Sequence, residues 1–181
     1  MSYLTAALAA VGVLCLVNLV LTFAVIRQVR RHGEKLAVGP MFRGEMTTLP
    51  AGTKVPEFST ATISGERRRL ADLTGSRSLV GFFTPGCPPC HAQLPEFSKL
   101  ARTVPGGAAQ VLAVIAGEEK DAAEFGAELG EVASVVIESG HGPVATAFST
   151  YGRPSFYLVG ADGRVEASGS TVRRLAHPVP A

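Results

Sequence analysis

The feature that most constrains the fold is a pair of cysteines, Cys87 and Cys90, placed where one sequence pattern gives way to another. Residues 79–83 form a continuous apolar run, which is typical of a buried strand. After the pair, apolar residues such as Leu94 and Phe97 recur with helical spacing. The sequence therefore predicts a strand-to-helix turn that carries two thiols in the first turn of the helix.

Two thiols at this spacing indicate reversible disulfide chemistry. A helix N-terminus favours the thiolate form of an exposed cysteine, and the thiolate attacks other disulfides. A structural cross-link is less favoured, because closing so short a loop stabilises a chain by only about 2 kcal/mol. A zinc site normally needs a second Cys or His pair, and besides His91 the histidines are scattered: His32, His141 and His177. We expect Cys87 and Cys90 to be catalytic, with no metal ion and no cofactor.

Residues 4–26 contain no charged side chain and predict a transmembrane anchor. As a helix they would extend over ~34 Å, slightly more than the hydrocarbon core of a bilayer. A cleaved signal peptide is less favoured, because residues 1–3 lack a basic side chain and no convincing cleavage site follows the apolar core. We expect a membrane anchor at 4–26, a basic linker at 27–52 and a globular domain at 53–181.

The chain is thus expected to be a single-pass protein of the cell membrane, but two indications of sidedness conflict. Four basic residues follow the apolar segment and none precedes it, which by the positive-inside rule favours a cytoplasmic domain: Arg27, Arg30, Arg31 and Lys35. Disulfide exchange instead favours an oxidising compartment outside the cytoplasm. No nucleic-acid partner is expected, since the short basic run 67–69 has no interleaved aromatic residue and is interpreted as a solvated hairpin edge.

Beyond the linker, strand patterns alternate with helix patterns. We expect a hairpin within 58–70, a helical turn at 71–73, strands at 79–83, 110–116 and 132–137, helices from 87 to about 104, at 118–129 and at 144–148, and a closing hairpin of 155–159 with 164–167. This order predicts an α/β fold with a mixed central sheet flanked by helices. Since only 171–176 is left to form a last helix, one sheet face is expected to lack a full covering helix. Any apolar patch left exposed there would be a candidate docking surface for a partner or for the membrane.

At this point the residues resemble the thioredoxin superfamily, and within it the membrane-anchored thiol-disulfide oxidoreductases of the TlpA and ResA type, with a layout similar to that of MauD proteins. The resemblance spans 53 to about 167 and rests on the Val55-Pro56-Glu57-Phe58 opening, the apolar strand before Cys87-Pro88-Pro89-Cys90, Pro95, and Arg153-Pro154-Ser155-Phe156 ahead of Asp162-Gly163. It implies a thioredoxin-like fold. It also implies that Cys87 is the attacking thiol and Cys90 the resolving thiol. Pro154 would be a cis-proline that presents the backbone of Arg153 to an extended substrate segment.

Three positions depart from the family pattern. Gly86 stands where Trp is common, Gly81 where an acidic residue or Asn is frequent, and Gln93 where the anchored reductases often carry Glu. Since neither Gly81 nor Gln93 can transfer a proton, deprotonation of Cys90 is expected to depend on solvent or on another group. His91 is interpreted as a surface residue.

Two prolines between the thiols favour the reducing direction. Pro88 and Pro89 lack the N–H groups that could stabilise a Cys87 thiolate, and a less stabilised thiolate is a better reductant. We expect a reductase or isomerase that takes electrons from an unidentified donor and exchanges them with protein disulfides and dithiols.

Three alternatives stay open. A peroxiredoxin-like peroxidase is suggested by Thr84, three residues before Cys87, although Val80 stands where the usual proline would be. An assembly module could carry Cu(I) on Cys87, Cys90 and His91. A noncatalytic interaction domain would need neither thiol.

Overall fold

The computed structural model describes residues 7, 12, 14–19, 48–150 and 152–176. The chain divides into two compact units, residues 1–45 and 46–181. In the first unit the described residues are helical, and the rest of the predicted anchor at 4–26 lies outside the described residues. None of the helices formed by described residues has the length and apolar character needed to cross a bilayer.

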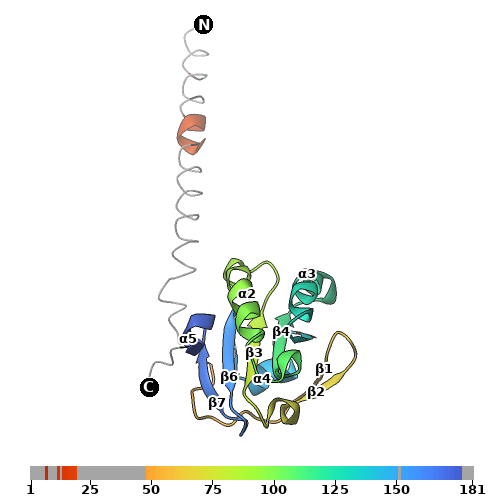
Figure 1. The fold of residues 1–181 in the computed structure, drawn as a ribbon. Coiled ribbons are helices and arrows are strands. Elements are labelled where there is room, and N and C mark those ends of the chain that lie inside the picture. Colours follow the sequence, from red (N-terminus) through yellow and green to blue (C-terminus); the bar gives the residue numbers. More distant parts are fainter. Residues whose placement is uncertain (1–6, 8–11, 13, 20–47, 151, 177–181) are drawn as a thin grey trace. The chain divides into compact units, whose positions relative to one another are not determined.

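The second unit is built on a five-stranded mixed sheet (Figure 1), which confirms the predicted α/β fold. In the order β5-β4-β3-β6-β7, the strands are Ser134–Glu138, Val111–Ala116, Ser78–Phe83, Ser155–Val159 and Val165–Gly169. The central strand β3 pairs in parallel with β4 and antiparallel with β6. Among the described residues, four helices accompany the sheet: α2 (Pro88–Ala101), α3 (Glu119–Gly130), α4 (Pro143–Ala147) and α5 (Val172–Ala176). Two short 3₁₀ helices, η1 (Leu70–Leu73) and η2 (Gly107–Gln110), and a separate hairpin of β1 (Ser59–Ala61) and β2 (Arg67–Arg69) complete the unit.

Both faces of the sheet are buried, which explains the continuous apolar character of its central strands. Leu79 and Phe83 of β3 pack in a cluster with residues of α2, α3 and α5. Val80 and Phe82 point to the other face and pack with residues of η1 and α4. Alternate residues of one strand therefore supply two separate cores, and the cysteine pair lies on the side of the first core.

The short helix α5 closes the sheet face that was expected to be incompletely covered. Val172 and Leu175 are buried, and α5 packs against β6, β7 and α2. The Val172 N–H donates to Gln93 Oε1 over 3.0 Å, and Arg173 forms an ion pair with Glu96 of α2 at 2.9 Å. Among the described residues of this unit, Ile63 is the one large hydrophobic residue that is exposed. The expectation that this face lacks a full covering helix was therefore wrong for the described residues, because side chains of α2 fix α5 in place.

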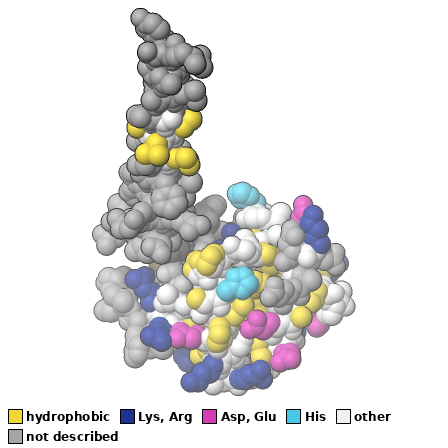
Figure 2. Space-filling model, turned by 90° about the horizontal axis from the view of Figure 1, so that it is seen from above, with side chains coloured by type: hydrophobic (Ala, Val, Ile, Leu, Met, Phe, Trp, Pro, Cys, Tyr) yellow, Lys and Arg dark blue, Asp and Glu magenta, His cyan; other side chains and the backbone are white. Residues whose placement is uncertain are grey.

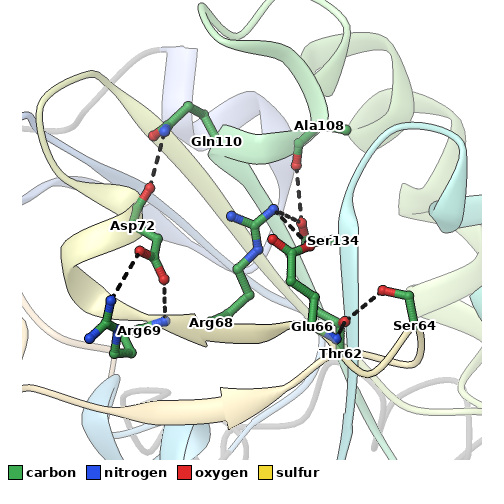
Figure 3. Close-up of polar contacts among 9 residues, drawn as sticks. All are labelled: Thr62, Ser64, Glu66, Arg68, Arg69, Asp72, Ala108, Gln110 and Ser134. Carbon is green, nitrogen blue, oxygen red and sulfur yellow. Dashed lines mark hydrogen bonds and ion pairs between the residues drawn. The ribbon is translucent and has the colours of Figure 1, made fainter.

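Charged side chains of both signs are interspersed on the face of the domain seen in Figure 2, with hydrophobic side chains among them. The basic run 67–69 differs from the expected solvated edge at its middle residue. Arg67 and Arg69 are exposed, but the Arg68 side chain is only 14% exposed and its Nη2 donates to Ser134 Oγ of β5 over 2.8 Å (Figure 3).

The hairpin protects an edge of the main sheet through this contact. Strand β5 is an edge strand, and beside Arg68 the backbone N–H of Ile63 donates to Val135 O over 2.9 Å. An exposed strand edge is a site for unwanted pairing with other chains, and covering it removes that site. Arg68 thus has a structural role that its place in a basic run did not indicate.

The opposite edge strand, β7, receives the chain as it enters the domain. Gly52 N donates to Val165 O over 2.7 Å, and Val165 N donates to Thr53 O over 2.9 Å. Further along, Ser168 Oγ donates to Leu49 O over 3.0 Å. Residues 49–53 therefore lie along β7.

Candidate active site

The candidate site lies where β3 ends and α2 begins, as predicted. Cys87 is the N-cap residue of α2, with extended backbone angles (φ −98°, ψ 104°), and Pro88 and Pro89 occupy the first two helical positions. Proline suits the first helical position, because its fixed φ matches the helix and the N–H there has no partner within the helix. The Cys87 carbonyl accepts hydrogen bonds from Cys90 N at 2.9 Å and His91 N at 3.2 Å. The helix therefore starts at the cysteine pair.

The two sulfurs contact each other and differ in exposure. Cys90 Sγ lies 2.6 Å from Cys87 Sγ, and both residues are free thiols. Cys87 is partly exposed, whereas the Cys90 side chain is fully buried. A bulky protein disulfide can therefore reach Cys87 but not Cys90. This arrangement fits an attacking thiol backed by a resolving one.

Burial dominates the acid–base behaviour of Cys90. It raises the pKa of the thiol from 9.0 to about 12, and the contact with Cys87 acts in the same direction. A backbone contact from Thr84 and the positive charge of Arg153 act against this rise. Cys90 is thus a neutral thiol at physiological pH in the reduced protein.

The predicted cis-proline is confirmed. The peptide bond between Arg153 and Pro154 is cis, Pro154 is buried directly before β6, and the Arg153 side chain is partly buried. The charge of Arg153 acts on Cys90, so the topology brings this loop and the cysteine pair together although they are distant in sequence. Pro95 is an exposed residue inside α2, and the helix runs unbroken from Pro88 to Ala101.

The three departures from the family pattern have local structural reasons. A Cβ atom at Gly81 would lie 2.5 Å from the ring of Phe97, so the aromatic side chain fills the space that a larger residue would need. Gln93 accepts the hydrogen bond that holds the start of α5. Gly86 has φ +70°, a left-handed conformation that strains other residues, so a Trp there would require a different turn.

Sequence reasoning missed the side chains around Arg153. Two of its nitrogen atoms, Nε and Nη2, are buried and have no hydrogen-bond partner among the described residues. Burial lowers the pKa of Arg153, and electrostatic interactions with the acidic groups of Cys90, Glu138 and Tyr157 oppose that effect. Glu138 is a buried acidic residue at the end of β5, which is a signal that the sequence offered and the prediction did not use.

The remaining polar groups near Arg153 already have partners. The Glu138 carboxylate accepts from Val144 N at 3.0 Å, Ala145 N at 3.2 Å and Thr60 Oγ1 at 3.3 Å. The Tyr157 hydroxyl donates to Phe148 O over 3.1 Å.

His91 does not join the cysteines in a metal cluster. The described part of the chain contains no group of three or more His, Cys, Asp and Glu side chains that could hold a metal ion. The exposed His91 ring packs edge-on against Phe125 of α3, with ring centroids 4.5 Å apart. This contact agrees with the interpretation of His91 as a surface residue.

The family model for the AhpC/TSA family matches residues 51–168, which include the sheet and the cysteine pair. The chain belongs to the AhpC/TSA family. Among proteins similar to this AhpC/TSA chain, the thiol:disulfide interchange protein CycY of Rhizobium leguminosarum bv. viciae is 28% identical over 141 residues, which cover 74% of each chain. The thiol-disulfide oxidoreductase ResA of Bacillus subtilis is 25% identical over 133 residues, covering 72% of this chain and 74% of that protein.

Solved structures agree on the fold of this AhpC/TSA member. A thiol:disulfide interchange protein from Bacteroides sp. superposes with a TM-score of 0.54 at 22% identity, over 66% of this chain and 81% of that one. The fold is therefore thioredoxin-like, as the sequence resemblance implied.

Proposed function

We propose that this chain is a membrane-anchored thiol-disulfide oxidoreductase that reduces protein disulfides through Cys87 and Cys90. The chain is a thiol-disulfide oxidoreductase by its relatives, which include a thiol:disulfide interchange protein and a thiol-disulfide oxidoreductase. The observation that carries the assignment of residues is the pair of contacting thiols, one partly exposed and one buried, at the start of α2.

The reaction proceeds in two exchanges. The Cys87 thiolate attacks one sulfur of a substrate disulfide, forms a mixed disulfide, and releases the other substrate sulfur as a thiolate that takes up a proton. Cys90, as a thiolate, then attacks Cys87 Sγ and closes the Cys87–Cys90 disulfide. The second substrate sulfur leaves and is protonated in turn. Two electrons pass to the substrate, and a dithiol donor must restore the reduced pair.

The reducing direction is supported by the start of α2. An N-cap side chain usually accepts a hydrogen bond from the N–H of the second or third helical residue. Here the second is Pro89, the Cys90 N–H donates to the Cys87 carbonyl, and the Cys87 side chain receives no capping hydrogen bond. A thiolate without these donors is less stabilised, so the dithiol gives up electrons more readily.

Anchoring at 4–26, with a basic linker at 27–52 and a thioredoxin-like domain at 53–181, is part of the proposal. It is supported by the uncharged segment and the basic residues that follow it. The domain then acts beside the membrane on protein disulfides and dithiols.

The proposal is tested by trapping with a Cys90→Ala variant of the full chain. Substrate proteins should stay covalently bound to Cys87 and be released by dithiothreitol. The matched control is the Cys87→Ser, Cys90→Ala double variant, which should retain nothing. If the wild-type chain also reduces no test protein disulfide while both thiols react with alkylating reagents, the proposed function is wrong.

A peroxidase is the second candidate, since Thr84 precedes Cys87 by three residues. Thiol-coupled consumption of hydrogen peroxide by the wild-type chain, lost in Cys87→Ser, would favour it. We expect no such consumption above the background of the free thiols.

A further inference from the structure

Arg153 is a partly buried residue whose innermost atoms are shielded in a way that its position in a loop does not explain. Its Nε and Nη2 atoms are shielded from solvent and have no hydrogen-bond partner among the described residues. Leaving such donors unpaired costs free energy, more so when the group is charged. An arginine that only kept the surface soluble could expose its guanidinium to water. The burial of Nε and Nη2 therefore needs another explanation.

The acidic groups that act on the charge of Arg153 come from three elements: Cys90 on α2, Glu138 on β5 and Tyr157 on β6. The Glu138 carboxylate is occupied by two backbone N–H groups of α4 and by Thr60. The Tyr157 hydroxyl is bonded to Phe148 O, and burial raises its pKa to about 12, so it stays neutral. Cys90 is therefore the one of the three whose charge changes during the reaction.

Cys90, in turn, has no proton acceptor among the charged groups that act on it. Those groups are Cys87, which becomes part of the mixed disulfide, and Arg153. The strand beneath Cys90 cannot supply a carboxylate at position 81, because the Phe97 ring fills that space. The thiolate needed for the second exchange must then be stabilised by charge.

We propose that the buried Arg153 guanidinium is a fixed positive charge that favours the Cys90 thiolate in the second exchange, in place of a proton-accepting side chain. This inference rests on the proposed function. In the mixed disulfide, Cys90 loses its proton to water, and the thiolate attacks Cys87 Sγ. The Cys87–Cys90 bond forms, the bond to the substrate sulfur breaks, and the departing thiolate recovers a proton from water. Arg153 keeps its charge throughout and accepts no proton.

The test follows both exchanges in one trace. The reduced full chain in detergent, with Cys15→Ser so that only the pair reacts, is mixed with dithiobis-nitrobenzoate. The first equivalent of thionitrobenzoate reports attack by Cys87, and the second reports displacement by Cys90. The ratio of the second rate to the first is measured against pH for wild type, Arg153→Gln and Arg153→Lys. The matched control is Arg102→Gln, which removes an exposed charge beyond the far end of α2.

We expect Arg153→Gln to lower the ratio about tenfold, since an opposite charge within reach shifts a thiol pKa by one unit or more. Arg153→Lys should keep the ratio close to wild type near neutral pH. Its profile should flatten at high pH as the lysine loses its proton, while the wild-type rate continues to rise. The Arg102→Gln ratio should not change.

Two results would overturn the inference. Either the Arg153→Gln ratio and pH profile match wild type, or Arg153→Lys is as slow as Arg153→Gln near neutral pH, which would assign Arg153 a role in shape alone. Failure of the proposed function would look different, because the wild-type chain itself would then reduce no test protein disulfide, whatever its two rates with dithiobis-nitrobenzoate.

Discussion

Cys87 and Cys90 lie in contact, yet each sulfur meets different surroundings, and the chemistry follows from that difference. Cys87 is partly exposed at the N-cap of α2 and has two prolines beside it. Cys90 is fully buried, and its pKa is raised to about 12 mainly by that burial. In the proposed reaction, the exposed thiol meets the substrate and the buried thiol completes the exchange.

Replacing Pro89 with alanine should make the disulfide form a stronger oxidant. The variant restores an N–H at the second helical position, from which an N-cap side chain usually accepts. A hydrogen bond to a charged group is worth about 1.5 to 3 kcal/mol, which raises a two-electron potential by about 30 mV or more. Equilibration with glutathione buffers measures the shift.

Pro88→Ala is the matched control for this prediction, since the first helical N–H is not the one that an N-cap side chain usually reaches. Its potential should change less. Equal shifts in the two variants, or none in Pro89→Ala, would contradict the account of the reducing direction.

The raised pKa of Cys90 also predicts how the stability of the reduced protein depends on pH. The folded thiol keeps its proton up to about pH 12, whereas the unfolded thiol loses it near 9.0. Since the unfolded state binds fewer protons between these values, stability is complete below about pH 9 and falls as pH rises towards 12. We expect a loss of about 2 kcal/mol between about pH 8 and pH 10.5 from this thiol.

Urea unfolding of the reduced chain under argon at several pH values measures this loss. Cys90→Ala should show a flatter pH dependence in the alkaline range, and it retains the contribution of Tyr157, whose pKa is raised in the same direction. Identical alkaline slopes for the two proteins would show that Cys90 does not hold its proton as described.

At the scale of elements, the hairpin of β1 and β2 shows what a single side chain can do for a sheet. Arg68 reaches Ser134 on β5, and the chain between the two strands bonds to the same edge through Ile63 and Val135. These contacts cover an edge strand that would otherwise present unpaired backbone groups.

Arg68→Ala is therefore expected to destabilise the domain by about 1 to 2 kcal/mol, because the hydrogen bond to Ser134 is lost in a mostly buried position. Arg67→Ala is a matched control, since Arg67 is exposed and its loss should cost at most about 0.5 kcal/mol. Urea denaturation of both variants measures the difference. If both variants lose the same stability, the docking role of Arg68 is wrong.

Most elements of the second unit could be predicted from the sequence, because their signals are local. The apolar run before Cys87 is β3, and the helical spacing of Leu94 and Phe97 is α2. The cis peptide at Pro154 was implied by the family pattern and is present. What could not be predicted depends on contacts between distant residues: Phe97 filling the space at Gly81, and Arg68 reaching Ser134.

The candidate site divides in the same way. Spacing alone placed the two thiols together at a helix start. The surroundings of Arg153 follow from how α2, β5 and β6 are brought together, and no local pattern near position 153 reports that. The covering of the sheet by α5 was misjudged because a helix of five residues has a weak pattern, and its fixing by Gln93 and Glu96 is a tertiary effect.

At the scale of the whole molecule, the chain joins a compact redox domain to an N-terminal segment with an uncharged stretch. If that stretch anchors the protein as proposed, the full chain should remain in the membrane pellet after alkaline carbonate extraction. A fragment that begins at Met46, the start of the compact unit, should appear in the supernatant. Extraction of the full chain by carbonate would contradict the anchor.

The attachment of the two chain ends gives the domain an unequal response to tension. A force on residues 49–53 acts on the edge strand β7, because these residues form hydrogen bonds with Val165 and Ser168 of that strand. A pull on the C-terminal end acts on α5, and through Gln93 and Glu96 it is transmitted to the helix that carries the thiols. A tether on the N-terminal side of the domain would therefore exert force on β7 and not on the cysteine pair. A force applied on the C-terminal side would reach α2 and, with it, Cys87 and Cys90.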